Sequence, residues 1–251
     1  MKSIFTGCVG VIDSGVGGLT ILRQLQQKYP TCNFVYIADS AYCPYGTKQP
    51  QEILLRAMHL VEFLHDCGSQ AVVIACNTAS VFADSYRQQF SLPIYDVITP
   101  TCQRVADITN SKRVALLATN VTVKSCAYQR VLSARGIATI AFPCSEFVSF
   151  VEAGAVDTLE CGCAVDKALH VLPKCNVDTI ILGCTHFPLL RKKIAPYANG
   201  ARIVECCSDF QPTVYNGTTS KKTVFLTTGV ENQANNASKW FGQVGFTHIE
   251  I

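Results

Sequence analysis

The sequence has few charges, no long apolar run and no paired cysteine ligands, and each absence excludes a class of protein. Charged residues make up 16% of the 251 positions and the net charge is +3. The short basic clusters at 191–193 and 221–222 are isolated, so we interpret them as solvated helix ends or loops rather than a nucleic-acid surface. No apolar run approaches the ~18 residues that span a bilayer. The opening MKSIFTGCVGVIDSG is too short and glycine-rich in its apolar part for a signal peptide. We therefore expect a cytoplasmic protein that binds neither nucleic acid nor membranes.

The fourteen cysteines are expected to be mostly buried thiols. The chain is 49% hydrophobic and carries no export signal, which does not fit a secreted disulfide scaffold. Structural zinc sites usually present CxxC pairs, and the sequence contains none. The close pairs Cys161 with Cys163 and Cys206 with Cys207 lack a matching pair elsewhere. The sequence therefore predicts no metal site.

Short apolar runs bounded by glycine, proline or polar residues predict buried strands of parallel sheets. They occur in two series, at 9–12, 34–37, 72–75 and 94–97, and at 114–117, 139–142, 180–183 and 202–205. Residues 9 and 114, and 34 and 139, are 105 apart, whereas 72 and 180, and 94 and 202, are 108 apart. This repetition predicts two similar α/β units, each a doubly wound, mostly parallel sheet.

Helical periodicity fills the gaps between the strands. Amphipathic patterns predict helices over 18–29, 51–68 and 122–136. A further strand in TVFLTTG and a helix in VENQANNASKWFG have no counterpart in the repeat, so we expect them to pack on the first unit. The expected domains are 1–98 plus 209–251, and 99–208, with the active site in the cleft between them.

Two of the strands lead into a cysteine followed by polar residues. VVIACNTAS places Cys76 before Asn77 and Thr78, and TIILGCTHF places Cys184 before Thr185 and His186. Ligands in such sheets bind beyond the carboxyl ends of the strands. A single cysteine here would most simply be a small buried hydrophobe, but two at equivalent ends of repeated units are expected to face each other across the cleft.

The other strand ends supply further polar groups. IDSGVGGLT places Asp13 and Ser14 before a glycine-rich turn that does not complete a dinucleotide fingerprint. Asp13 could be a helix cap or could influence a neighbouring acid or base. The loop ADSAYCPYGTK contributes Asp39, and its Tyr45 and Gly46 would expose backbone donors.

Two acid/base groups on opposite faces of a substrate suit racemisation at an α-carbon. One group removes a proton from one face and the other returns a proton to the opposite face. An ordinary cysteine pKa of about 8.5 lets one thiol act as thiolate while the other stays protonated. We expect Asp13 to tune Cys76, and His186 to tune Cys184. The expected donors to substrate and carbanion are Ser14, Asn77, Thr78, Thr185 and the backbone around Tyr45 and Gly46.

Five stretches of the sequence match one known family: GVIDSGVGGLT, YIADSAYCPYGTK, VVIACNTAS, LLATNVTVKSCAY and IILGCTHFPLL. In these stretches the sequence resembles glutamate racemase. The resemblance implies two α/β domains, a homodimer, no pyridoxal phosphate, metal or nucleotide, and a role in supplying D-glutamate for peptidoglycan. By position, Cys76 would handle the α-proton of D-glutamate and Cys184 that of L-glutamate. Glu152 in FVEAG matches a supporting carboxylate. The substrate contacts that the resemblance implies are Asp13, Ser14, Tyr45, Gly46, Asn77, Thr78, Thr185 and His186.

The sequence departs from the family pattern at three places. These are Thr99 in ITPTC, the segment VECCSDFQPTVYNG at 204–217, and Val230 in TTGVEN. We expect all three to lie away from the cysteine motifs and to affect regulation, domain motion and oligomer contacts rather than the chemistry.

Three alternatives stay open. A racemase of another acidic amino acid, such as aspartate, would share the two cysteines, although there glutamate typically replaces His186. A hydrolase or amidase would use Cys184 with His186 and leave Cys76 without a role. A non-enzymatic amino-acid sensor would require one inert thiol.

Overall fold

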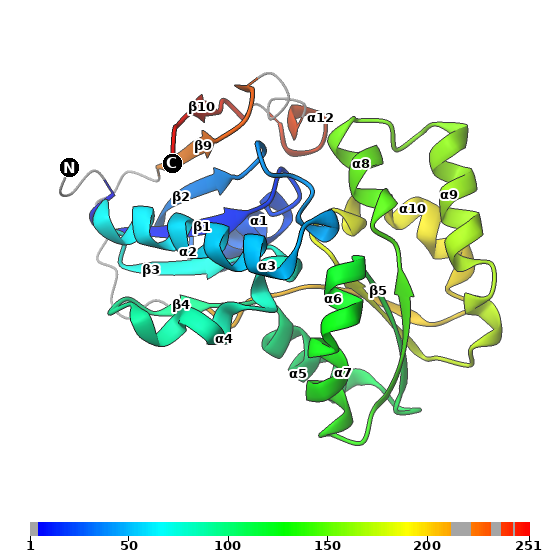
Figure 1. Cartoon of the computed structure of the whole chain (residues 1–251). Coiled ribbons are helices and arrows are strands. Elements are labelled where there is room, and N and C mark those ends of the chain that lie inside the picture. Colours follow the sequence, from blue (N-terminus) through cyan, green and yellow to red (C-terminus); the bar gives the residue numbers. More distant parts are fainter. Residues whose placement is uncertain (1–4, 212–221, 232–236, 243) are drawn as a thin grey trace.

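Two parallel β-sheets organise the chain (Figure 1). The computed structural model describes residues 5–211, 222–231, 237–242 and 244–251. Its strands are β1 (Cys8–Asp13), β2 (Asn33–Ala38), β3 (Ala71–Ile74), β4 (Ile94–Tyr95), β5 (Arg113–Ala118), β6 (Ala138–Pro143), β7 (Thr179–Gly183), β8 (Arg202–Glu205), β9 (Thr223–Thr227) and β10 (Thr247–His248). One sheet has the order β10-β9-β2-β1-β3-β4 and the other β6-β5-β7-β8. All neighbouring strands are parallel, which confirms the predicted fold class.

The two sheets repeat one strand order. The series β2-β1-β3-β4 in the first sheet corresponds to β6-β5-β7-β8 in the second, as the 105- and 108-residue offsets predict. The extra strand β9 pairs with β2, with Phe34 opposite Thr223, so it packs on the first unit as expected. The division into domains at residues 98 and 208 stays a proposal.

Helices lie between the strands along the chain and flank the sheets. They are α1 (Leu19–Lys28), α2 (Pro50–Asp66), α3 (Asn77–Ser80), α4 (Ala83–Tyr86), α5 (Ile98–Ile108), α6 (Asn120–Ser125), α7 (Ala127–Ser133), α8 (Glu146–Glu152), α9 (Leu159–Leu169), α10 (Arg191–Ile194) and α12 (Ser238–Phe241). The first two match the predicted helices. Pro50 opens α2, where its missing N–H costs nothing. Of the helix predicted in VENQANNASKWFG, residues 232–236 lie outside the described residues, as do residues 212–217 of the divergent segment.

The prediction of one helix over 122–136 is wrong, because the chain breaks between α6 and α7. Cys126 adopts a left-handed conformation, with φ of 55°, which no residue inside a right-handed helix can have. The Ser125 hydroxyl accepts a hydrogen bond from the Ala127 N–H at 3.2 Å. Thr119 caps the start of α6 by accepting from the Thr122 N–H at 3.4 Å.

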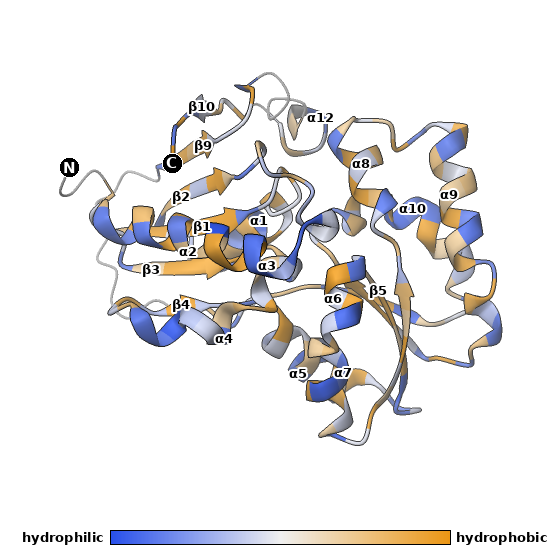
Figure 2. Ribbon diagram, viewed as in Figure 1, coloured by the Kyte–Doolittle hydropathy of each residue, from blue (hydrophilic) through white to orange (hydrophobic). Residues whose placement is uncertain are grey.

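Each sheet is buried on both faces, as parallel sheets usually are. In β1, Val11 packs into one apolar cluster with α1 residues, and Ile12 packs into another with α2 residues. Leu116 and Leu117 of β5 divide in the same way between the two faces of the second sheet. Figure 2 shows apolar strands and helices with hydrophilic outer faces. No helix among the described residues is long and apolar enough to cross a membrane.

Candidate active site

The carboxyl ends of the two sheets meet, and hydrogen bonds join them. The Thr185 hydroxyl, beyond β7, donates to Asp13 Oδ1 at 3.1 Å. The Val16 N–H, beyond β1, donates to Glu152 Oε1 at 3.0 Å. These contacts join the end of β1 and the turn after it to Thr185 of the second cysteine motif and to Glu152.

Cys76 lies between β3 and α3 and is 5% exposed. Its Sγ is 3.8 Å from Ser14 Oγ. Burial and the nearby Asp13 charge raise its pKa to about 12, although a hydrogen bond from the Ala79 N–H acts in the opposite direction. The free protein therefore holds a proton on this sulfur at neutral pH.

Cys184 follows β7 and is 6% exposed. Its Sγ lies 3.7 Å from His186 Nδ1, and His186 Nε2 lies 2.6 Å from Glu152 Oε1. Burial would lower the pKa of His186, but the hydrogen bonds to Cys184 and Glu152 and the Glu152 charge outweigh it and raise the pKa well above its ordinary value. An imidazolium therefore stands beside the Cys184 sulfur, where it stabilises negative charge.

Asp13, the last residue of β1, is 2% exposed. Its Oδ2 accepts the Gly15 N–H at 3.1 Å, and its Oδ1 accepts the Thr185 hydroxyl. Burial raises its pKa to about 6, and the His186 charge and these hydrogen bonds limit the rise. Asp13 is therefore mostly ionised at pH 7 and is positioned beside Thr185 of the second cysteine motif.

Glycines after β1 allow the second unit to approach the first. A Cβ on Gly15 would stand 2.1 Å from Glu152 Oε1, and one on Gly17 would stand 2.5 Å from His186 Nδ1. Both distances are shorter than any real contact. The glycine-rich turn therefore serves close packing across the site, in agreement with its failure to match a dinucleotide fingerprint.

Asn77, 2% exposed, has one side of its carboxamide fixed and the other without a partner. Its Oδ1 accepts hydrogen bonds from Tyr128 Oη at 2.5 Å and Cys206 Sγ at 3.2 Å. Its buried Nδ2 has no partner among the described residues. A buried donor without an acceptor is costly, so this atom is suited to a ligand oxygen. Cys206 belongs to the divergent segment, and the expectation that the whole segment lies away from the cysteine motifs is therefore wrong.

A cluster of threonine hydroxyls adds two residues that the sequence did not reveal. Thr78 Oγ1 lies 2.9 Å from Thr119 Oγ1 and 3.4 Å from Thr122 Oγ1. Thr119 directly follows β5, at the sheet edge where the cysteines also lie. Applying the strand-end rule to LLATN would have found it.

The loop after β2 places Tyr45, Gly46 and Asp39. Asp39 is fully buried and accepts hydrogen bonds from Tyr45, from Thr228 at 2.7 Å, and from Arg56 at 2.7 and 2.9 Å. Tyr45, Asp13 and Cys76 lie around one space that is too small for a water molecule. A Cβ on Gly46 would stand 2.7 Å from Thr119 Cβ. Asp39 thus holds the loop, with Tyr45 beside Asp13 and Cys76 and Gly46 against Thr119.

A cavity of about 390 Å³ opens beside Glu152, between the loop after β2 and α8. Its lining residues are Ser40, Cys43, Pro44, Val148, Ser149, Glu152 and Ala153. Neither Cys76 nor Cys184 is among them, and both thiols are buried. Beside the cavity, potential metal-ligand atoms of Cys43, Glu152 and His186 lie within 4.8 Å of one another.

Comparison with known proteins identifies similar chains. A family model described as Asp/Glu/Hydantoin racemase matches residues 18–208. A glutamate racemase of Persephonella marina is 36% identical over 196 residues, which cover 76% of each chain. A glutamate racemase isoform of Bacillus anthracis matches with a TM-score of 0.89 and 28% identity, over 97% of both chains. The glutamate racemase of Francisella tularensis in complex with D-glutamate matches with a TM-score of 0.83 and 29% identity, over 97% of this chain and 96% of that one.

Proposed function

The chain belongs to the Asp/Glu/Hydantoin racemase family, and we propose that it interconverts L- and D-glutamate by proton transfer between the α-carbon and two cysteines. The observation that carries the proposal is the pair of buried thiols at the ends of β3 and β7, each in its own polar setting. The names of its relatives, glutamate racemases, support glutamate as substrate.

In the proposed reaction, Cys184 as thiolate removes the α-proton of L-glutamate. Cys76 as thiol donates a proton to the opposite face, which yields D-glutamate, and the reverse reaction exchanges these roles. The free site favours proton removal from L-glutamate. The Cys76 pKa of about 12 keeps a proton on that sulfur, and the His186 imidazolium lies beside Cys184. Glu152 holds the imidazolium in place.

Polar groups around the thiols would bind the substrate and stabilise the carbanion. We assign the unpartnered Nδ2 of Asn77 and the Thr78–Thr119–Thr122 hydroxyl cluster to the substrate's carboxylate oxygens. We assign the Asp13 carboxylate to the substrate ammonium. Further substrate contacts are assigned to Ser14, Thr185, Tyr45 and Gly46. Burial excludes water, which strengthens each interaction with developing charge.

A chiral assay tests this function. Purified protein is incubated separately with L-glutamate, D-glutamate, L-aspartate and D-aspartate, without added cofactor. We expect each glutamate enantiomer to reach a one-to-one mixture, with little change in aspartate. Turnover of aspartate without turnover of glutamate would show that aspartate is the substrate. Loss of activity after removal of a bound cofactor would contradict the cofactor-free mechanism.

Amide hydrolysis is the second candidate, favoured by one observation. Cys184, His186 and Glu152 contact one another in the order of a nucleophile, base and orienting acid. A hydrolase of this kind would release ammonia from glutamine and would not need Cys76. Ammonia release by a Cys76→Ala variant would therefore support hydrolysis over racemisation.

Tyr128→Phe is expected to raise KM for glutamate about 2- to 10-fold with a smaller effect on kcat. The change removes one hydrogen bond that fixes the Asn77 carboxamide, worth about 0.5–1.5 kcal/mol. Tyr86→Phe is the matched control, because the buried Tyr86 hydroxyl has no partner among the described residues. Equal KM values in both variants would show that Tyr128 does not position Asn77.

The cellular role is part of the same proposal. It comprises a cytoplasmic homodimer without metal, pyridoxal phosphate or nucleotide in the reaction, which supplies D-glutamate for peptidoglycan. Racemisation fits this role because it needs no second substrate.

A further inference from the structure

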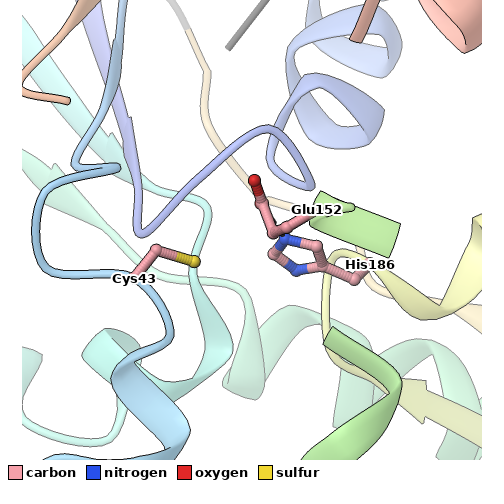
Figure 3. A group of neighbouring side chains, drawn as sticks. All are labelled: Cys43, Glu152 and His186. Carbon is pink, nitrogen blue, oxygen red and sulfur yellow. Dashed lines mark hydrogen bonds and ion pairs between the residues drawn. The ribbon is translucent and has the colours of Figure 1, made fainter. Parts of the chain in front are cut away.

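Cys43, Glu152 and His186 form a compact set of metal-ligand atoms from three separate segments (Figure 3). Cys43 lies in the loop after β2, Glu152 ends α8, and His186 follows β7. Their sulfur, oxygen and nitrogen atoms lie within 4.8 Å of one another. Gly15 makes room for the set, because a Cβ there would meet both Glu152 and Cys43 Sγ, the latter at 3.2 Å.

The donor atoms match the preferences of zinc. Zn²⁺ takes thiolate, imidazole and carboxylate ligands at about 2.0–2.3 Å in tetrahedral geometry, so its ligand atoms stand roughly 3.3–3.8 Å apart. The 2.6 Å contact between His186 Nε2 and Glu152 Oε1 would open by less than about 1 Å to admit the ion. The other ring nitrogen, Nδ1, faces Cys184 and Thr185, so Nε2, beside Glu152, is the nitrogen that would bind the ion.

The cavity of about 390 Å³ gives Cys43 and Glu152 of this set a route to solvent. Cys43 and Glu152 both line it, and the two reactive thiols do not. An ion can therefore reach Cys43 and Glu152 without displacing Cys76 or Cys184. Water entering from the cavity would supply the fourth ligand.

We propose that Cys43, Glu152 and His186 form an inhibitory site for a thiophilic divalent cation such as Zn²⁺. The bound ion separates Glu152 from His186 and pulls the imidazole toward the cavity, so the Cys184 sulfur loses its partner. Metal binding at this site does not depend on the reaction. The inhibition rests on the proposed racemase function.

Cobalt absorption and a racemase assay together test the site. Wild-type protein is titrated with Co²⁺ in buffer without chelating thiols, and Zn²⁺ is then added as competitor. We expect a thiolate-to-cobalt charge-transfer band at one ion per chain, its loss on zinc addition, and inhibition of glutamate racemisation by Zn²⁺ over the same concentration range.

The Cys43→Ser variant, and Cys43→Ala as a second variant, are expected to keep metal-free racemase activity and to lose the cobalt band. Inhibition of these variants should need at least about tenfold more Zn²⁺, because loss of even a second-shell partner costs 10- to 100-fold in metal affinity. Cys163→Ser is the control, because Cys163 is an exposed thiol on α9. An unchanged band and zinc sensitivity in the Cys43 variants would overturn the proposal by placing the ion on other thiols. Absence of both effects in wild type would also overturn it. A cobalt band without glutamate turnover would instead contradict the racemase function and leave the site standing.

Discussion

Replacing Cys76 or Cys184 by alanine is expected to lower kcat/KM for glutamate by roughly 10²- to 10⁴-fold, the range that a positioned acid or base contributes. Each thiol serves as the base in one direction and the acid in the other. Since L- and D-glutamate have equal free energy in water, each substitution must reduce the two directions by the same factor. Steady-state kinetics from both enantiomers checks this equality.

The matched control for these variants is Cys161→Ala. Cys161 is fully buried in the apolar cluster around α9 and lies outside the active site, so its loss should leave kcat/KM unchanged. Melting temperatures of the catalytic variants should stay within about 5 °C of wild type, because one sulfur atom is a small volume to lose. Activity near the wild-type level in either Cys76→Ala or Cys184→Ala would rule out the two-thiol mechanism.

Arg56→Met is expected to lower the free energy of unfolding by roughly 3–5 kcal/mol. Arg56 is 6% exposed and binds the fully buried Asp39 through two hydrogen bonds. Methionine fills similar space but leaves the Asp39 carboxylate buried without an opposite charge. Urea unfolding with linear extrapolation measures the loss.

Arg191→Met is the control for Arg56→Met. Arg191 and Glu205 form an exposed ion pair at 3.2 Å, with side chains 48% and 35% exposed, and such pairs contribute about 0–1 kcal/mol. Adding Asp39→Asn to Arg56→Met should recover part of the stability, because it removes the unpaired charge. Equal effects of Arg56→Met and Arg191→Met would mean that the buried pair does not hold the loop after β2.

Local patterns in the sequence were enough to predict the strands of both sheets except the short edge strand β10. Buried parallel strands are short apolar runs, so their positions and their repetition could be recognised without coordinates. The strand-end rule then located Asp13, Cys76 and Cys184. The break at Cys126 could not be seen, because a left-handed residue in the middle of an amphipathic pattern leaves the periodicity unchanged.

Contacts between distant segments were harder to predict. The resemblance suggested Glu152, but its pairing with His186 depends on how α8 packs against the end of β7. Cys206 contacts Asn77 because β8 ends beside the site, although its sequence segment looked peripheral. Cys43 joins two ligands that lie more than a hundred residues away along the chain, so no spacing rule for metal sites could reveal it.

In the proposed mechanism, two different groups exchange protons with the two faces of the substrate. The most direct test is to incubate L-glutamate with the protein in deuterated water and to stop the reaction early. The two enantiomers are then separated and the mass of each is measured by mass spectrometry. Because the Cys76 thiol exchanges with solvent, the D-glutamate formed should carry one deuterium at the α-carbon, while the remaining L-glutamate keeps its proton. D-Glutamate that retains the original proton would show that a single base serves both faces and would contradict the mechanism.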